Sequence, residues 1–168
     1  MMYRVIKALD GLFGLERASA HCDIPCGIYD PISAQLAALS VLRFLDQLAE
    51  LDTGEPLSLA DQAKLSRIVE QKESHAEQVK QEVRVIWGDY FKAEQLEQCP
   101  DTHELVHQIM RVASSCKQGI DRAAGVELVE LANRFAENFW RTKQVPTFTA
   151  VCPYKPSVDV VYPALHDS

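Results

Sequence analysis

Residues 30–51, with the sequence DPISAQLAALSVLRFLDQLAEL, determine the fold that this chain predicts. Asp30 before Pro31 is typical of a helix start, because the carboxylate caps unbonded N–H groups and proline at the first helical position loses no needed N–H. The segment 53–56, Thr-Gly-Glu-Pro, then ends the helix. The apolar side chains between these signals are Ile32, Leu36, Leu39, Leu42, Leu45 and Leu48. Their three- and four-residue spacing predicts one apolar helix face.

Three further amphipathic helices follow this first one. Ser58 with Asp61 forms a capping pattern that begins the second helix. The inward face of that helix comprises Leu65, Ile68, Lys72, Ala76, Val79, Val83 and Ile86. Asp101 with Glu104 is expected to cap a third helix that continues to about residue 116, and a fourth helix is expected over about 121–142. Four amphipathic helices with short connections indicate an all-α protein, an antiparallel up-down four-helix bundle.

The remaining segments flank this bundle. From residue 145 onward the prolines exclude a fifth helix and leave an extended C-terminal tail, which must wrap the bundle or a neighbour. These prolines are Pro146, Pro153, Pro156 and Pro163. We therefore expect a removable leader at 1–20, an irregular N-terminal metal hook plus the four-helix bundle at 21–144, and a proline-rich tail at 145–168.

Composition narrows the range of functions. The 168 residues suffice for one domain with a hydrophobic core, and a formal net charge of −7 makes nucleic acid an unexpected partner. An apolar run of roughly 18 to 20 residues, which a membrane helix needs, does not occur in the sequence. Five cysteines are an odd number, and the last three are widely scattered. This usage argues against a disulfide framework and favours a reducing compartment or a metal role.

The first twenty residues have some features of a cleavable leader. The small residues 18–20, Ala-Ser-Ala, resemble a peptidase cleavage site. A secretory apolar segment should be unbroken, but Lys7, Asp10, Glu16 and Arg17 interrupt this one. We therefore expect removal of the leader by a processing peptidase and a cytoplasmic location, with export less favoured.

Residues 21–31, HCDIPCGIYDP, contain a strong candidate for metal binding. The thiolates of Cys22 and Cys26 lie four residues apart across a proline turn and can bind one ion. If the chain begins at His21, its α-amine can bind as well. The backbone nitrogen of Cys22 can then deprotonate and close a chelate ring, which completes a plane of two nitrogens and two sulfurs.

This donor set favours nickel over zinc. A low-spin d⁸ ion such as Ni(II) prefers a plane, whereas Zn²⁺ prefers a tetrahedron. The imidazole of His21 can approach the plane as a fifth, axial ligand. Anionic thiolate and amidate donors also stabilise Ni(III), which brings a one-electron couple into the biological range.

The same segment resembles the nickel-hook motif of the nickel superoxide dismutase family, His-Cys-Asp-x-Pro-Cys-Gly-x-Tyr-Asp-Pro. All nine specified positions match, with Ile24 and Ile28 at the variable ones. The patch 87–92, Trp-Gly-Asp-Tyr-Phe-Lys, is similar to a run that follows the family's second helix. The similarity extends to about residue 143 and includes Phe139-Trp140.

The resemblance implies dismutation of superoxide to dioxygen and hydrogen peroxide through Ni(II)/Ni(III) cycling, after cleavage before His21. It implies a homohexamer with one nickel ion per subunit, held by His21, Cys22 and Cys26. Tyr29 would stand over the open axial face, Asp23 would support the hook, and Tyr90 would lie just behind them. The acidic body should repel superoxide, so fast turnover requires a local positive potential.

Two positions depart from the family pattern. Family members hold the axial imidazole with a glutamate on the first helix and an arginine on the second, and in register these positions are Ala37 and His75. The clamp is therefore absent or replaced, and His75 is the candidate to replace it. Cys152 lies in the tail outside the shared core, and we expect it to be a buried thiol rather than a ligand.

Two alternatives from other functional classes stay open. His103-Glu104-x-x-His107 fits a zinc-protease pattern on a helix, which would make the protein a zinc hydrolase. The extended pattern of one protease class would place Gly and His where Met110 and Ala113 stand. Two surface histidines are the simpler interpretation. The second alternative is a nickel or copper carrier that uses the same hook without redox turnover.

Overall fold

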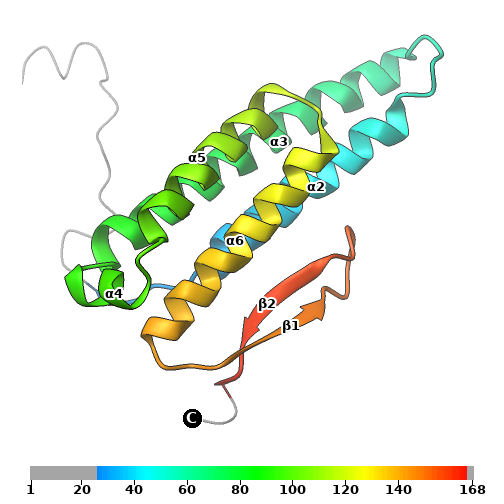
Figure 1. Cartoon of the computed structure of the whole chain (residues 1–168). Coiled ribbons are helices and arrows are strands. Elements are labelled where there is room, and N and C mark those ends of the chain that lie inside the picture. The colour runs from blue at the N-terminus through cyan, green and yellow to red at the C-terminus, as the bar shows by residue number, and fades with distance from the viewer. Residues whose placement is uncertain (1–25, 166–168) are drawn as a thin grey trace, which may run out of the picture.

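The computed structural model describes residues 26–165, which form a helical bundle with a small β-hairpin along one side (Figure 1). The four long helices are α2 (Ile32–Leu51), α3 (Leu59–Val85), α5 (Thr102–Gln118) and α6 (Arg122–Thr142). Helix α2 packs against α3 and α6, and α5 packs against the same two helices. This arrangement confirms the predicted four-helix bundle. No helix among the described residues combines the length and apolar character that crossing a membrane requires.

The helix starts follow the capping signals with two corrections. Helix α2 begins at Ile32 with Pro31 at the N-cap position, one residue later than the predicted start with Asp30 as the cap. The Asp30 carboxylate still accepts a hydrogen bond from the Ile32 N–H at 2.8 Å. The Ser58 hydroxyl accepts from the Asp61 N–H at 3.1 Å. The expected cap by Asp101 and Glu104 is wrong, because the Asp101 side chain makes no cap bond. Asp101 instead accepts from the side chain of Asn138 on α6, a long-range partner that local spacing does not reveal.

Between α3 and α5 the chain forms two short elements that the sequence did not predict. A π-helix, η1 (Ile86–Tyr90), continues α3, with Phe91 N donating to Ile86 O at 3.3 Å. The short helix α4 (Ala93–Gln98) then leads toward α5. A π-helix widens the helical turn by one residue and often marks a functional position. Tyr90, a predicted site residue, is the last residue of this π-helix.

The bundle core contains one buried lysine. Lys72 on α3 is only 2% exposed, and its ammonium donates to the carbonyl oxygens of Cys116, Lys117 and Gly119. These carbonyls lie at the C-terminal end of α5, where backbone acceptors lack helical N–H donors. Burial lowers the pKa of Lys72. A lysine at an inward position therefore serves as the cap of a neighbouring helix.

Helices α2 and α6 approach each other closely at Gly125. A methyl group at Gly125 would lie 2.6 Å from Cδ1 of Leu45 and 3.5 Å from Cα of Leu42.

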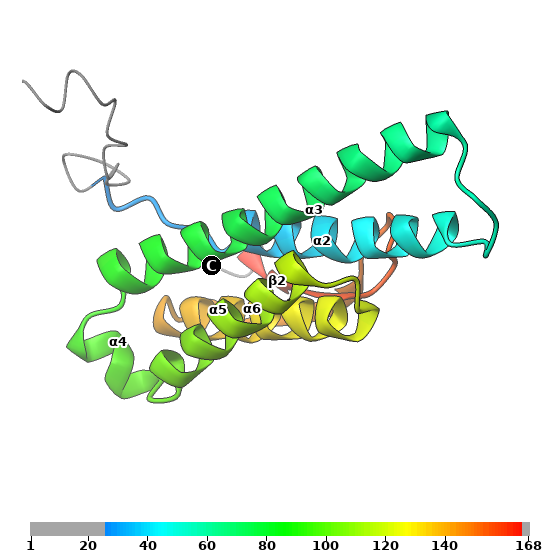
Figure 2. The ribbon, with the colours of Figure 1, turned by 90° about the horizontal axis from the view of Figure 1, so that it is seen from above.

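Helices α2 and α3 extend past the ends of α5 and α6 at the loop that connects α2 to α3, as the view from above shows (Figure 2).

The C-terminal tail forms an antiparallel hairpin of β1 (Thr147–Val151) and β2 (Asp159–Pro163), with Thr147 opposite Pro163 and Val151 opposite Asp159. The predicted extended tail on the bundle is confirmed, while its pairing into a hairpin was not foreseen. Val160 and Val161 of β2 are buried. The side chains of Gln35 and Asn133 hold the backbone of Val161, with Gln35 donating to its carbonyl at 2.9 Å and Asn133 accepting from its N–H at 3.2 Å.

Candidate metal centre

Cys26 and Gly27 form the turn that precedes α2. Cys26 is exposed, and its Sγ lies 4.0 Å from the carbonyl oxygen of Ile28. Gly27 has a φ of +70°, in the left-handed region that residues with a side chain rarely adopt. The space around its Cα is open, so backbone conformation alone accounts for the glycine. The turn leaves the Cys26 thiol exposed, where a metal ion can reach it.

Tyr29 and Tyr90 come together beside this turn. Their ring centroids lie 5.9 Å apart at an interplanar angle of 48°. The Tyr90 ring also contacts Phe91 at 5.3 Å and Phe139 at 4.8 Å. Two residues that the sequence assigned to one site therefore lie in contact, although one precedes α2 and the other ends η1.

The end of α6 adds two residues that sequence reasoning missed. The hydroxyl oxygens of Tyr90 and Thr142 lie 2.7 Å apart. The ammonium of Lys143 lies 4.6 Å from the centroid of the Tyr90 ring, within the range of a cation–π interaction. Both residues follow the Phe139-Trp140 patch in the sequence, but nothing in their spacing indicates a contact with Tyr90.

The rest of the predicted hook, His21, Cys22 and Asp23, lies outside the described residues, so the full ligand set stays a prediction. Among residues 26–165, no cluster of three or more His, Cys, Asp or Glu side chains could hold a metal ion. Cys26 is exposed, and its sulfur is a soft donor suited to nickel, as the predicted set of two thiolates, an amine and an amidate requires of it.

The other described cysteines are unsuited to metal binding. Cys99, Cys116 and Cys152 are at most 2% exposed. Burial raises the pKa of the Cys99 thiol, and burial raises that of Cys116 to about 11. Because the thiolate is the form that binds metals, these groups are poor ligands. The prediction that Cys152 is a buried thiol is confirmed, and its Sγ donates to Tyr154 O at 3.2 Å.

The two positions of the altered clamp lie in different surroundings. Ala37 is 2% exposed in the core. The ring of His75 lies against Phe44 on α2, with ring centroids 5.4 Å apart, and its Nδ1 lies 2.7 Å from Gln71 O in the same helix. His75 is thus held by its own helix and by Phe44, and its relation to His21 stays a prediction.

The His-Glu-x-x-His pattern gains no support from the described residues. His103 and His107 are both exposed on α5. The indole N–H of Trp87 donates to Nδ1 of His103 at 3.0 Å. An indole nitrogen is a donor only, so Nδ1 of His103 is the acceptor and the neutral ring carries its proton on Nε2. In this arrangement neither ring nitrogen of His103 has a lone pair available for zinc.

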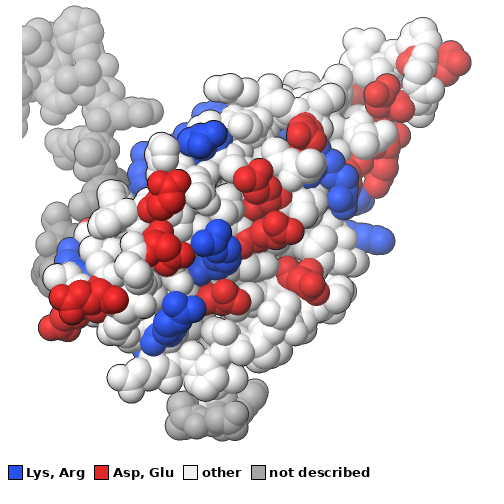
Figure 3. Space-filling view, in the orientation of Figure 1, with Lys and Arg blue, Asp and Glu red and all other residues white. Residues whose placement is uncertain are grey.

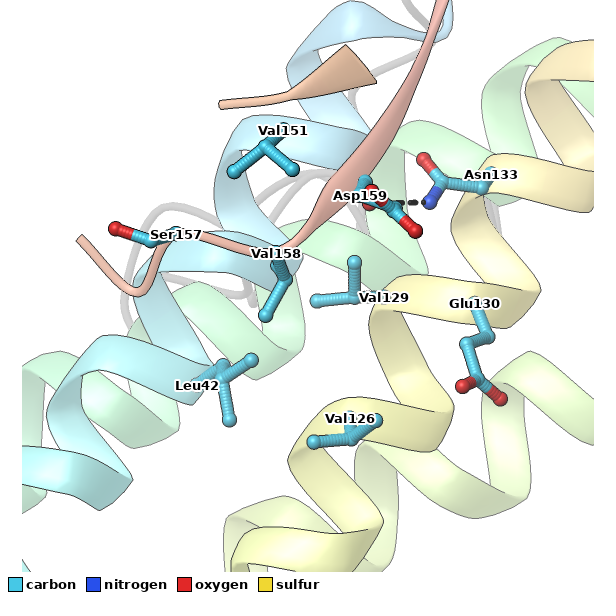
Figure 4. Close-up of a pocket in the computed structure, with 9 residues that line it drawn as sticks. All are labelled: Leu42, Val126, Val129, Glu130, Asn133, Val151, Ser157, Val158 and Asp159. Carbon is cyan, nitrogen blue, oxygen red and sulfur yellow. Dashed lines mark hydrogen bonds between the residues drawn. The ribbon is translucent and has the colours of Figure 1, made fainter. Parts of the chain in front are cut away.

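A pocket beside the hairpin is separate from the candidate centre. It lies between α2, α6 and the hairpin, with Asn133 donating to Asp159 O at 2.9 Å across one side (Figure 4). Its apolar wall comprises Leu42, Val126, Val129, Val151 and Val158. No predicted site residue lines it.

Charged side chains are interspersed over the face shown in Figure 3. Asp and Glu gather at the tip where α2 joins α3 and over α4. The formal net charge of the chain is −7. Against this acidic background, Lys143 supplies a local positive charge beside Tyr90.

Comparison with known proteins assigns the family. The sequence model described as "Nickel-containing superoxide dismutase" matches residues 16–143. The chain is 36% identical over 126 residues to "Superoxide dismutase [Ni]" of Streptomyces coelicolor, a match that covers 75% of this chain and 90% of the relative. It is 35% identical over 128 residues to the protein of the same name from Streptomyces seoulensis, with 76% and 92% covered.

Solved structures agree with this result. A native nickel superoxide dismutase structure is similar with a TM-score of 0.65 and 34% sequence identity, covering 74% of this chain and 99% of that one. A nickel-containing superoxide dismutase with nickel ligation of the oxidised state has a TM-score of 0.64, with the same identity and coverage. With its exposed Cys26 turn and its paired Tyr29 and Tyr90, this chain belongs to the nickel-containing superoxide dismutase family.

Proposed function

We propose that the protein converts superoxide to dioxygen and hydrogen peroxide once cleavage before His21 has freed the amine of that residue. The observation that carries this proposal is the exposed Cys26 thiol, three residues before a tyrosine whose ring packs on Tyr90, in a chain of the nickel-containing superoxide dismutase family. His21, Cys22 and Cys26 would hold the nickel ion. The bound ion supplies a one-electron Ni(II)/Ni(III) couple.

The chain's own residues shape access to that centre. Tyr29 and Tyr90 form an aromatic wall at the base of the hook, which favours a small anion over larger molecules. Lys143 places a cation beside this wall and counters the repulsion that an acidic protein exerts on superoxide. Asp23 would support the hook through its backbone.

The leader explains why processing is needed. While Ala20 is bonded to His21, the nitrogen of His21 is an amide rather than an amine and cannot serve as a neutral amine donor. The proposal therefore includes a processing peptidase. A cytoplasmic location belongs to it as well, since charged residues interrupt the apolar part of the leader. Cell fractionation that finds the mature protein outside the cytoplasm would contradict this part.

The test compares superoxide decay catalysed by three nickel-treated chains. One begins at His21, one begins at Ala20, and one retains the whole leader. The Ala20 chain is the matched control, because a single added residue converts the amine to an amide. We expect rapid nickel-dependent decay only with the chain that begins at His21. Equal inactivity of all three, with nickel bound to the His21 chain, would instead support a metal carrier.

Assembly into a homohexamer, which the family resemblance implies, is part of the proposal. Sedimentation of the trimmed, nickel-loaded protein should give the mass of six chains. A monomeric mass at all concentrations would contradict the assembly while leaving the activity test unaffected.

A further inference from the structure

We propose that Thr142 is a positioning residue that fixes the direction of the Tyr90 hydroxyl, so that Tyr90 accepts hydrogen bonds at the centre and does not donate them. The inference rests on the proposed function for its catalytic meaning. The hydrogen-bond direction itself rests only on the contacts at the end of α6.

The hydroxyl proton of Thr142 is used in a hydrogen bond within α6. The Thr142 hydroxyl donates to the carbonyl oxygen of Phe139 at 2.7 Å. Phe139 lies in the last turn of α6, where carbonyl groups run short of helical N–H donors, and the N–H of Lys143 donates to Trp140 O at 3.0 Å. Phe139 is fully buried, so its carbonyl oxygen needs a donor from within the protein.

The hydrogen bond from Thr142 to Phe139 determines the direction of the hydrogen bond between Thr142 and Tyr90. A threonine hydroxyl has one proton and two lone pairs. Since its proton points to Phe139 O, the 2.7 Å contact between Thr142 and Tyr90 is a bond from the Tyr90 O–H to Thr142. The chain of bonds therefore runs from Tyr90 through Thr142 to Phe139. The phenol oxygen of Tyr90 retains only acceptor capacity for a third group.

The Tyr90 ring is also held in place, which makes this direction a stable property of the site. Phe91, Phe139 and Tyr29 pack around the ring, and Lys143 lies over it. The ring therefore cannot turn its hydroxyl away from Thr142 without losing these contacts. It follows that a hydrogen bond donated to superoxide or peroxide must come from a group other than Tyr90.

The first experiment measures the bond directly in the full-length chain without nickel. Tyrosines are labelled with ¹³C at Cζ, and Tyr90→Phe assigns the Tyr90 signal. We expect Thr142→Val, which keeps the branched shape but loses the hydroxyl, to shift this signal upfield, because a phenol that donates a hydrogen bond has a more deshielded Cζ than one that does not. Thr142→Ser keeps the hydroxyl and should leave the signal in place. An unchanged or downfield-shifted Tyr90 signal in Thr142→Val would overturn the proposal.

The remaining tyrosine signals and the melting temperature show whether each variant is folded. Should Thr142→Val fail to fold, Thr142→Ala provides the same loss of hydroxyl with less crowding, and the same shift is expected from it.

The second experiment asks whether the bond acts in catalysis, using trimmed, nickel-loaded protein. We expect Thr142→Val to lower the superoxide decay rate constant as far as Tyr90→Phe does, while Thr142→Ser retains it. The double variant should be no slower than Tyr90→Phe alone, because both changes remove one interaction. Additive losses would show that Thr142 acts independently of Tyr90 and overturn the proposal. An inactive wild-type protein would refute the proposed function, while the Cζ signal still decides the hydrogen bond.

Discussion

Tyr29 and Tyr90 pack with their ring centroids 5.9 Å apart, which fastens the segment that follows Cys26 to the π-helix η1. Tyr90 is itself held by Phe139 and by Thr142 of α6. The segment that follows Cys26 is therefore anchored on two elements of the bundle, η1 and α6. In our proposal the bundle and the hook have separate roles: the bundle positions the aromatic wall, and the hook would supply the metal ligands.

Replacing the exposed cysteine should abolish nickel binding. In the trimmed protein, Cys26→Ser removes one thiolate, and the bound nickel measured after gel filtration should fall to the level of a metal-free blank. The matched control is Cys152→Ser, which changes a buried thiol whose bond to Tyr154 O a hydroxyl can also make. The control should retain nickel. Equal nickel in both variants would exclude Cys26 as a ligand.

Removing the cation beside Tyr90 should slow the capture of superoxide. Lys143→Gln should lower kcat/KM by about two- to tenfold at low salt and weaken its dependence on ionic strength, because an oppositely charged residue near the site steers the substrate. Lys155→Gln removes the same charge from the hairpin loop and serves as the control. Equal effects of both variants would show that net charge acts rather than the position of Lys143.

Gly125 should tolerate no larger side chain. Gly125→Val forces two methyl groups against Leu42 and Leu45 and should lower the free energy of unfolding by about 1–3 kcal/mol. Ala123→Val, on the exposed side of the same helix, introduces the same side chain and should change it by less than about 0.5 kcal/mol. Chemical denaturation measures both. Similar losses would mean that helix propensity, not close packing, disfavours valine.

Cys116 should make stability fall in alkaline solution. Burial raises the pKa of this thiol from 9.0 to about 11, so the unfolded chain loses the proton first. The resulting stability is complete below about pH 9 and is lost as the pH rises through about 11. The wild-type advantage over Cys116→Ala should shrink by about 1 kcal/mol between about pH 8 and about pH 10, as denaturation would measure. A constant difference would show that the thiol titrates normally.

The sequence predicted the features that local signals encode. Ser58 caps α3 where expected, because a side-chain oxygen and an N–H three residues away are enough for a cap. The prediction that the Asp101 side chain caps α5 was wrong for the opposite reason. Its carboxylate is used by Arg134 and Asn138, which reach it only once α5 and α6 have packed together.

Features that depend on distant partners could not be predicted. The hairpin is docked by Gln35 and Asn133, two helix residues with no sequence link to the tail. The contacts of Tyr90 with Thr142 and Lys143 exist because the ends of η1 and α6 meet. The metal ligands were proposed from coordination chemistry and family resemblance, and of these only Cys26 lies among the described residues.

Lys72, whose ammonium caps the end of α5, can serve as a chemical probe of local unfolding of the bundle. An amine-reactive reagent meets an exposed lysine such as Lys64 in the native state, but it meets Lys72 only when α3 separates from the α5–α6 turn. The rate at which Lys72 is modified, relative to Lys64, therefore measures the free energy of that separation without denaturant. The lysine buried between α3 and the end of α5 thus provides a site whose labelling follows the transient separation of these helices.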